Sequence, residues 1–391
     1  MITMIYETYS ISLESLTPIH IGDGTRLTPM DYCVEGNTFY LIDHERFFRS
    51  LPKEGRDRLI SLIQRTGASF SLKRYMDARG LRPKPYSIYG IRCESQEPRE
   101  VRRFVKDPSN LVYIPGSSLK GAIRTAILHK LLKEDEKRLL KALERVESTF
   151  EGTGPGVWRD QRKRIGNKVE EVAVRQGEKD PYYDALRFIQ TTDSMPQPPE
   201  KVLAVQEVRV FRENGRILPF PIFLEVVMKG CGFQGFLVLH RSLRPLLQSR
   251  KETDKPFSDE ELLYDLEKQS SEIANKDFIL EACNELSRDL LEHEISFAGN
   301  AQIESLRNFY MDLKAMRLRA DECLIRLGWA QGLLSTTLRL LLKERQAYQK
   351  ISRSLGLGSA GEPFPRTRRL LAKEGIPLGW AKMSIKEYKG P

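Results

Sequence analysis

The sequence has few cysteines, and none of them is placed for a disulfide framework or a zinc site. Its five cysteines are scattered among 391 residues, and no two form a Cys-x-x-Cys pair. Closely paired cysteines are the usual mark of structural zinc sites and of small disulfide-stapled folds. We therefore expect reduced cysteines, no metal site and no cofactor.

Long hydrophobic runs are also missing. No window approaches the roughly 18 continuous apolar residues of a membrane span. The segment Met1 to Tyr9 has neither the basic start nor the apolar run of a signal peptide. These absences predict a cytoplasmic protein with no membrane partner.

Acidic residues are in the minority, and their distribution is uneven. The chain has 63 Lys and Arg against 53 Asp and Glu, a net charge of +10. Residues 251–294 hold 14 acidic and 5 basic residues, a local charge of −9, so the rest carries 10 − (−9) = +19. An excess of this size indicates a polyanionic partner such as RNA.

Strand patterns and helix patterns both occur, without a regular β-α-β alternation. Alternating polarity predicts strands at 10–17, 202–212, 222–239 and 380–385, and a hairpin at 30–42. Helical spacing predicts helices after Asp43, at 119–132 and in the acidic stretch. The fold class expected is α+β.

Two basic or glycine-rich segments lack periodicity. Residues 79–107 suggest a surface connection and residues 151–181 an irregular insertion. We therefore divide the chain into an N-terminal domain, 1–240, with insertions at these two places, and a C-terminal lobe, 241–391. That lobe should hold acidic amphipathic helices, then a glycine-rich loop and a terminal strand.

The segment from Pro115 to Arg124 has the features of a phosphate site at a helix start. Gly116 permits a tight turn, and Ser117 or Ser118 can cap the helix, whose first N–H groups favour an anion. Lys120 and Arg124 lie four residues apart and add cations on one face. The alternative is an ordinary capped helix with solvated basic residues.

A second candidate is the late glycine loop. Gly328, Trp329 and Gly332 combine accessible backbone with an aromatic ring that could stack on a base, or the ring could simply fill the core. Neither loop ends in the Gly-Lys-Ser/Thr of a Walker A motif, so nucleotide hydrolysis is poorly supported.

Catalytic residues are scarce. Among five histidines, only His20 lies at a strand exit where a general base could meet a ribose 2′-hydroxyl. A hydrogen-bonded structural histidine is the alternative and the preferred interpretation, because no second acid or base is evident nearby.

Three segments together resemble the RAMP superfamily of CRISPR proteins. They are Leu16-Thr-Pro-Ile-His-Ile-Gly-Asp-Gly24, Ile114-Pro-Gly-Ser-Ser-Leu-Lys-Gly-Ala-Ile-Arg124 and Arg326-Leu-Gly-Trp-Ala-Gln-Gly332. The closing Phe364-Pro-Arg-Thr-Arg-Arg-Leu370 is similar to the subunit that caps type III-A (Csm) complexes near the 3′ end of the guide RNA, the crRNA. This resemblance implies a ferredoxin-like, RRM-like core with large insertions.

The resemblance also implies partners and site residues. The partners would be crRNA, the neighbouring backbone RAMP subunit, other Csm subunits and host nucleases that trim crRNA. The RNA-binding residues would be Gly22, Asp23, Gly24, Gly116, Ser117, Ser118, Lys120, Arg124, Gly328, Trp329, Gly332, Arg366 and Arg368. Asp31 resembles a cleavage residue of backbone subunits, but the capping subunit is not regarded as a nuclease.

Three functions remain open. The first is a non-catalytic, crRNA-binding structural subunit that supports crRNA maturation and antiviral defence. The second is a metal-independent crRNA-processing endoribonuclease that uses His20 as its base. The third is a protein-interaction cap whose acidic helices recruit a nuclease.

Overall fold

The computed structural model describes residues 6–95, 98–148, 165–176, 179, 183–241, 260–342, 365–388 and 390. Helices and strands are mixed along these ranges without a regular alternation, which confirms the predicted α+β class. Among the helices described, none is long and apolar enough to cross a membrane.

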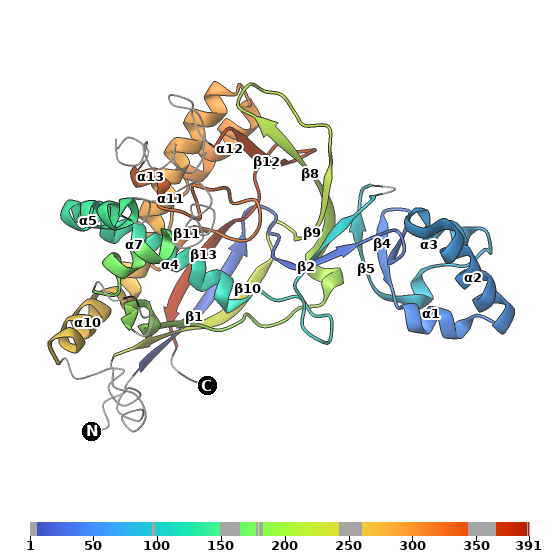
Figure 1. Cartoon of the computed structure of the whole chain (residues 1–391), viewed down its shortest axis with the longest axis horizontal. Helices are drawn as coiled ribbons and strands as arrows, with labels where there is room; N and C mark the ends of the chain where they lie inside the picture. The colour runs from blue at the N-terminus through green and yellow to red at the C-terminus, as the bar shows by residue number, and fades with distance from the viewer. Residues whose placement is uncertain are drawn as a thin grey trace.

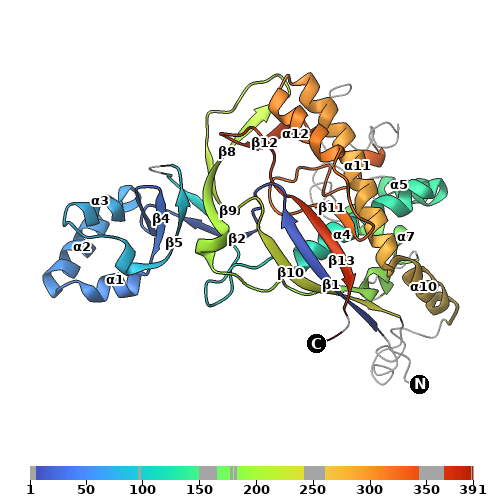
Figure 2. The same cartoon turned by 180° about the vertical axis from the view of Figure 1, so that it is seen from behind.

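A five-stranded antiparallel sheet, sheet A, lies at the centre of the molecule (Figure 1, Figure 2). Its order is β11-β13-β1-β10-β7. The strands are β1 (Tyr6–Ser15), β7 (Ile189–Thr191), β10 (Gly232–His240), β11 (Glu322–Arg326) and β13 (Trp380–Glu387). In β1 the side chains of Ile11 and Leu13 point into the core and those of Ser12 and Glu14 point outward, as strand alternation requires.

Two helices complete a ferredoxin-like core. Helix α4 (Gly116–Glu134) follows β1 and precedes β7, and α11 (Lys276–Asn300) follows β10. In the sheet, β1 lies between β10 and β13, which is the arrangement of a βαββαβ fold. The apolar faces of α4 and α11 share one hydrophobic core with β1 and β10.

A second sheet, sheet B, lies beside sheet A. Its order is β2-β6-β9-β8-β5-β4-β3, and β12 pairs with β8. The bounds are β2 (Gly22–Leu27), β3 (Tyr32–Glu35), β4 (Thr38–Ile42), β5 (Ser87–Cys93), β6 (Val101–Phe104), β8 (Leu203–Arg212), β9 (Ile222–Val227) and β12 (Thr367–Leu371).

The far end of sheet B carries a small helical extension with its own core (Figure 1). It contains α1 (His44–Ser50), α2 (Lys53–Thr66), α3 (Leu72–Asp77) and the short helices η1 (Gly67–Ser69) and η2 (Lys84–Tyr86). Asp43 caps α1 by accepting a hydrogen bond from the N–H of Arg46, which confirms the predicted helix start.

Most of the remaining helices pack against α4, α11 or one another, and α8 lies against β5 and β8 of sheet B. They are α5 (Glu136–Glu147), α7 (Ile165–Ala173), η5 (Ala185–Phe188), α8 (Pro199–Val202), α10 (Glu260–Ile273), α12 (Glu304–Lys314) and α13 (Arg339–Leu342). The predicted acidic helices are confirmed as α10 and α11.

The prediction of a surface connection without periodicity at 79–107 is wrong for the part of this segment that forms strands. Strands β5 and β6 occupy this segment, and the side chains of Tyr89, Ile91 and Phe104 are buried. The sequence pattern did not reveal these strands, because basic residues lie among the apolar positions and obscure the alternation of polar and apolar residues. The insertion predicted at 151–181 lies mostly outside the described residues.

The division at residue 240 stays a prediction. Sheet A contains strands from both sides of that position, because β13 pairs with β1 over the register Tyr9↔Glu387 to Ser15↔Ala381. The C-terminal elements described here therefore contribute to the same sheet as the first strand.

Candidate nucleic-acid interface

The first turn of α4 is docked tightly against the end of β7. A Cβ atom at Gly116 would lie 2.5 Å from the carbonyl oxygen of Thr191, so only glycine fits without a shift of backbone. The residue before the helix, Pro115, makes no side-chain cap. The glycine in this motif therefore serves close packing.

An aspartate satisfies the first N–H of the helix. The N–H of Gly116 donates to the Asp193 carboxylate at 2.7 Å. The prediction that Ser117 or Ser118 caps the helix is wrong, because both lie within its first turn. Ser117 is exposed and Ser118 half-buried, so the two hydroxyls stay on the surface predicted to contact RNA.

Lys120 and Arg124 have different surroundings. Arg124 bonds the carboxylates of Glu170 at 2.7 Å and Asp184 at 2.8 Å, and its side chain is 24% exposed. Lys120 forms no ion pair with a residue that the structure describes. Burial, aided by Arg124 and Arg187, lowers the pKa of Lys120 despite the opposing charge of Asp184. Lys120 is therefore the cation of this motif with unused binding capacity, and Arg124 is committed to internal carboxylates.

The early glycine loop is an exposed surface turn at the start of β2. The Asp23 carboxylate accepts the N–H of Thr25 at 2.8 Å and lies 3.4 Å from the guanidinium of Arg103. Gly24 has a φ of 90°, and a Cβ there would meet nothing within 4 Å. Together with exposed Gly22, this turn leaves backbone open to a ligand.

His20 is buried and faces the interior. Its relative exposure is 2%, and its Nδ1 atom lies 2.7 Å from the carbonyl oxygen of Glu225. Burial lowers its pKa below the ordinary range, although the Glu225 carbonyl and carboxylate oppose that shift. A neutral imidazole that donates from Nδ1 fits these facts and matches the preferred structural interpretation of this residue.

Glu225 is the centre of a buried polar network behind His20. Its carboxylate accepts hydrogen bonds from the hydroxyl of Tyr89 at 2.6 Å and from the N–H of Phe104 at 2.8 Å. The Lys106 ammonium lies 2.5 Å away, and both charged side chains are fully buried. This network fixes sheet B below the early loop.

The early and late motifs meet in space. Gly328 has a φ of 78°, and a Cβ there would lie 2.2 Å from the carbonyl oxygen of His20. The N–H of Trp329 donates to that same oxygen at 2.7 Å. Two segments about three hundred residues apart in the sequence therefore form one unit.

The ring of Trp329 contacts two arginines that were not among the predicted site residues. The guanidinium carbons of Arg102 and Arg369 each lie 4.8 Å from the ring centroid. Arg102 belongs to the basic segment 79–107 and Arg369 to the closing Arg-rich motif, so both carried a compositional signal. We call Arg102, Trp329 and Arg369 the Trp329 cluster.

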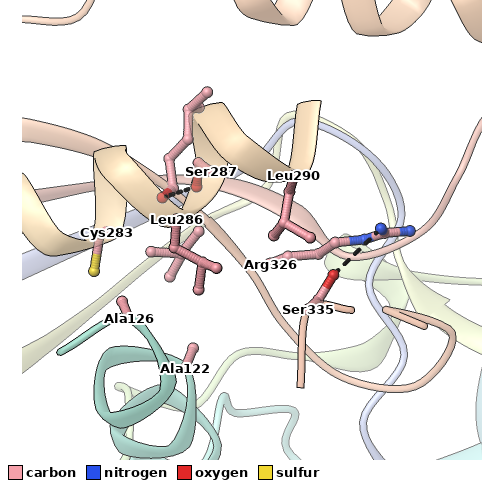
Figure 3. Close-up of a pocket in the computed structure, with 10 residues that line it drawn as sticks. Ala122, Ala126, Cys283, Leu286, Ser287, Leu290, Arg326 and Ser335 are labelled. Atoms are coloured by element: carbon pink, nitrogen blue, oxygen red, sulfur yellow. Dashed lines mark hydrogen bonds between the residues drawn. The ribbon is translucent and has the colours of Figure 1, made fainter. Parts of the chain in front are cut away.

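The hydroxyl of Ser335, which follows the late loop, points inward (Figure 3). It donates to the carbonyl oxygen of Gln331 at 2.9 Å and lies 3.5 Å from a guanidinium nitrogen of Arg326. Around it, side chains of α4, α11 and β11 line a small cavity. Exposed Gly332 thus remains the accessible part of this loop.

The two arginines of the closing motif that were predicted to bind RNA, Arg366 and Arg368, have different surroundings. Arg366 is exposed, consistent with the predicted surface role. Arg368 is corrected: its guanidinium lies 2.7 Å from the Glu294 carboxylate, and the side chains are 5% and 3% exposed. Arg368 points from β12 toward α11 because alternate residues of a strand face opposite sides.

No metal site is found in the part of the chain that the structure describes, where no three His, Cys, Asp or Glu side chains are grouped to hold an ion. From the exposure and pairing of these residues, the candidate surface consists of the accessible glycines and hydroxyls together with Lys120, Arg366 and the Trp329 cluster.

Comparison with known proteins identifies relatives over nearly the whole chain. Residues 12–293 match the family model described as the RAMP superfamily. The CRISPR system Cms protein Csm5 of Methanocaldococcus jannaschii is 25% identical over 410 residues, which cover 97% of this chain and 90% of that protein. The Csm5 protein of Streptococcus thermophilus is 25% identical over 247 residues, covering 57% and 61%.

Two solved structures share the fold at full length. A chain in the cryo-EM structure of a type III-A Csm-crRNA-target RNA ternary complex has a TM-score of 0.71 and 28% identity, covering 97% of this chain and 100% of that one. The crystal structure of T. onnurineus Csm5 has a TM-score of 0.68 and 27% identity, covering 95% and 99%.

Proposed function

This chain belongs to the RAMP superfamily, and from that premise we propose that it is a crRNA-binding structural subunit of a type III-A CRISPR complex. The observation that carries the proposal is the match, along both whole chains, to a component of a Csm-crRNA-target RNA complex. In this role the protein caps the filament on the 3′ side of the crRNA and supports crRNA maturation in the cytoplasm. Its partners are crRNA, the backbone RAMP subunit, other Csm subunits and nucleases that trim crRNA.

The proposed contact surface is assigned from exposure and pairing. Lys120 supplies a cation that no described carboxylate neutralises by direct contact. Backbone and polar contacts to phosphate come from exposed Gly22 to Gly24, Ser117, Gly332 and Arg366 and from half-buried Ser118. Such contacts give affinity without reading sequence. Arg124 and Gly116 position this surface from below.

We propose that the protein is not itself a ribonuclease. A general base must come within hydrogen-bond reach of the hydroxyl it deprotonates. His20 lies among Phe104, Trp329 and Glu225, with its Nδ1 atom already bonded. This geometry supports the structural role and gives the endoribonuclease alternative no favouring observation.

Reconstitution tests the proposed function. The full chain, mixed with tagged backbone subunits and crRNA, is expected to co-purify with them, and its omission should shorten the protected 3′ side of the crRNA. Lys120→Gln should weaken recovery, whereas Lys141→Gln, an exposed change on α5, should not. Failure of the wild-type chain to enter the complex would reject the proposal.

A cleavage assay separates the binder from the enzyme. Repeat RNA incubated with the purified chain in EDTA should stay intact. Cleavage that disappears in His20→Asn would instead establish the endoribonuclease.

A further inference from the structure

The Trp329 cluster contains two cations without a described counter-charge. Neither Arg102 nor Arg369 forms an ion pair with a carboxylate among the described residues, and the Nε atom of Arg102 is buried without a hydrogen-bond partner. Most other arginines of sheet B do have such partners: Arg26 pairs with Glu100, and Arg209 with Glu207. Arg102 and Arg369 differ from these two in having no described carboxylate partner.

The two guanidinium groups share one indole ring although their charges repel each other. Both lie over the same indole ring, which attracts cations through its quadrupole. Burial and the positive charge of Arg102 lower the pKa of Arg369, so the two charges repel each other. An anion between them would relieve that repulsion and satisfy the unused N–H donors.

Other contacts of Trp329 fix the position of its indole ring. The backbone N–H of Trp329 donates to the carbonyl oxygen of His20, and the ring packs on the buried cluster that includes Leu224 of β9 and Val208 of β8. Arg102 comes from β6 and Arg369 from β12, two strands of the same sheet. The ring thus holds two arginines from distant strands in one place.

The cluster remains accessible to a ligand. Arg369 is exposed and Arg102 half-exposed. The early glycine turn lies on the adjacent strand, because Arg26 of β2 is paired directly with Arg102 of β6. A chain of phosphates that follows the exposed turn of β2 would pass the cluster.

We infer that Arg102 and Arg369, held by Trp329, form a clamp for a single phosphodiester group of the RNA backbone. This inference rests on the proposed function and assigns Trp329 a role different from base stacking: it positions the two arginines. Guanidinium groups suit the task because their planar N–H donors can bond phosphate oxygens in pairs.

The test measures binding of a fluorescein-labelled single-stranded RNA, carrying the repeat-derived 3′ portion of the crRNA, to the full chain over a range of salt. Arg102→Gln and Arg369→Gln should each weaken binding on the order of tenfold, as expected for hydrogen bonds to a charged group. Loss of one phosphate contact from single-stranded RNA lowers the slope of log affinity against log salt by about 0.7.

The double variant distinguishes one shared phosphate from two separate ones. If both arginines hold the same group, the double variant should also lose a slope of only about 0.7, and its loss of affinity should be smaller than the product of the single losses. Arg82→Gln is the control, since Arg82 is an exposed arginine paired with Glu35 on the extension. It should bind RNA as the wild type does.

Trp329 is tested by substitutions that keep or remove the aromatic face. Trp329→Phe should retain most of the affinity and salt slope, whereas Trp329→Leu should lose both to the same extent as Arg102→Gln. A purely structural role would make the two variants bind RNA alike at equal thermal stability, and that result would overturn the positioning role.

The failures of the clamp and of the proposed function can be told apart. Wild-type affinity and slope in Arg102→Gln/Arg369→Gln, with binding still weakened by Lys120→Gln, would overturn the clamp alone. If the wild-type chain alone does not bind RNA, inorganic phosphate becomes the probe of the anion site, and entry into the reconstituted complex decides the proposed function. A Tm that phosphate raises equally in the wild type and the double variant would then overturn the anion site.

Discussion

The carbonyl oxygen of His20 occupies the place where a side chain at position 328 would begin. A Cβ atom at Gly328 would lie 2.2 Å from that oxygen. The contact joins the first loop after β1 to the loop after β11, and it seats Trp329 beside the two arginines.

Gly328→Ala should therefore be far more destabilising than Gly332→Ala. Both glycines have positive φ, 78° and 82°, but a Cβ at Gly332 meets nothing within 4 Å. The control should lose only the cost of a left-handed alanine, about 1–2 kcal/mol. Gly328→Ala should lose at least about 3 kcal/mol, because the Trp329 hydrogen bond is displaced as well. Urea unfolding measures both, and equal losses would contradict the close contact.

A second glycine pair tests the start of α4. A Cβ at Gly116 would lie 2.5 Å from the Thr191 carbonyl oxygen, whereas Gly121 in the same helix has open space. Gly121→Ala should stabilise the protein by about 0.5–1 kcal/mol, because alanine loses less backbone entropy in a helix. Gly116→Ala should destabilise it by roughly 2 kcal/mol or more, since backbone must shift. Stabilisation by both changes in thermal unfolding would show that the first turn is loosely docked.

Neutralising Glu225 should leave a buried charge without its partner. Lys106 and Glu225 are both fully buried at 2.5 Å. Breaking such a pair typically costs about 3–5 kcal/mol. Glu225→Gln should approach that loss in urea unfolding, and adding Lys106→Met should recover part of it. A double variant no more stable than Glu225→Gln would mean that the hydrogen bonds to Tyr89 and Phe104 dominate the network.

The stability of the protein should fall on mild acidification because of His20. Burial lowers the folded pKa of His20, so below about pH 6.5 the unfolded chain binds a proton that the folded chain excludes. The contribution of His20 is present above the unfolded pKa and is lost as the pH falls toward the folded pKa. His20→Asn keeps an N–H donor near the Nδ1 position but does not titrate.

Chemical unfolding of both proteins at several pH values checks the sign. The stability advantage of the wild type over His20→Asn should shrink between about pH 7 and pH 5. An advantage that is constant or grows on acidification would show that the imidazole is protonated in the folded state.

Local patterns predicted the elements whose signal lies within a few residues. The hairpin at 30–42, the cap at Asp43 and the helix at 119–132 all follow from spacing, turn residues or capping chemistry. The acidic helices followed in the same way from helical periodicity. In each case the interactions that determine the structure join residues that lie close together in the sequence.

Predictions failed or changed where long-range pairing decides the outcome. The sequence predicted an exposed Arg368, but this residue is buried and forms an ion pair with Glu294 of α11, a helix distant in the sequence. Arg124 is committed to Glu170 and Asp184, and Asp193 occupies the helix start predicted for an anion. No local pattern indicates which carboxylate meets which cation.

The assignment of candidate RNA contacts was limited for the same reason. The sequence singled out Trp329 but not the arginines over its ring, because Arg102 and Arg369 come from strands more than two hundred residues apart. The sequence also singled out half-buried Lys120 and exposed Gly24, because short polar motifs surround them, and their contacts with RNA stay predictions.

The pairing of β1 with β13 has a consequence for how the protein is made. Tyr9 lies opposite Glu387, so the contact spans 387 − 9 = 378 residues. At a synthesis rate of roughly 5–20 residues per second, the first strand waits for some tens of seconds before this neighbour leaves the ribosome. Throughout that interval β1 presents an unpaired edge, and the ferredoxin-like core cannot close before β13 has been synthesised. Nascent chains of this protein should therefore depend on shielding of that edge until β13 is available to pair with it.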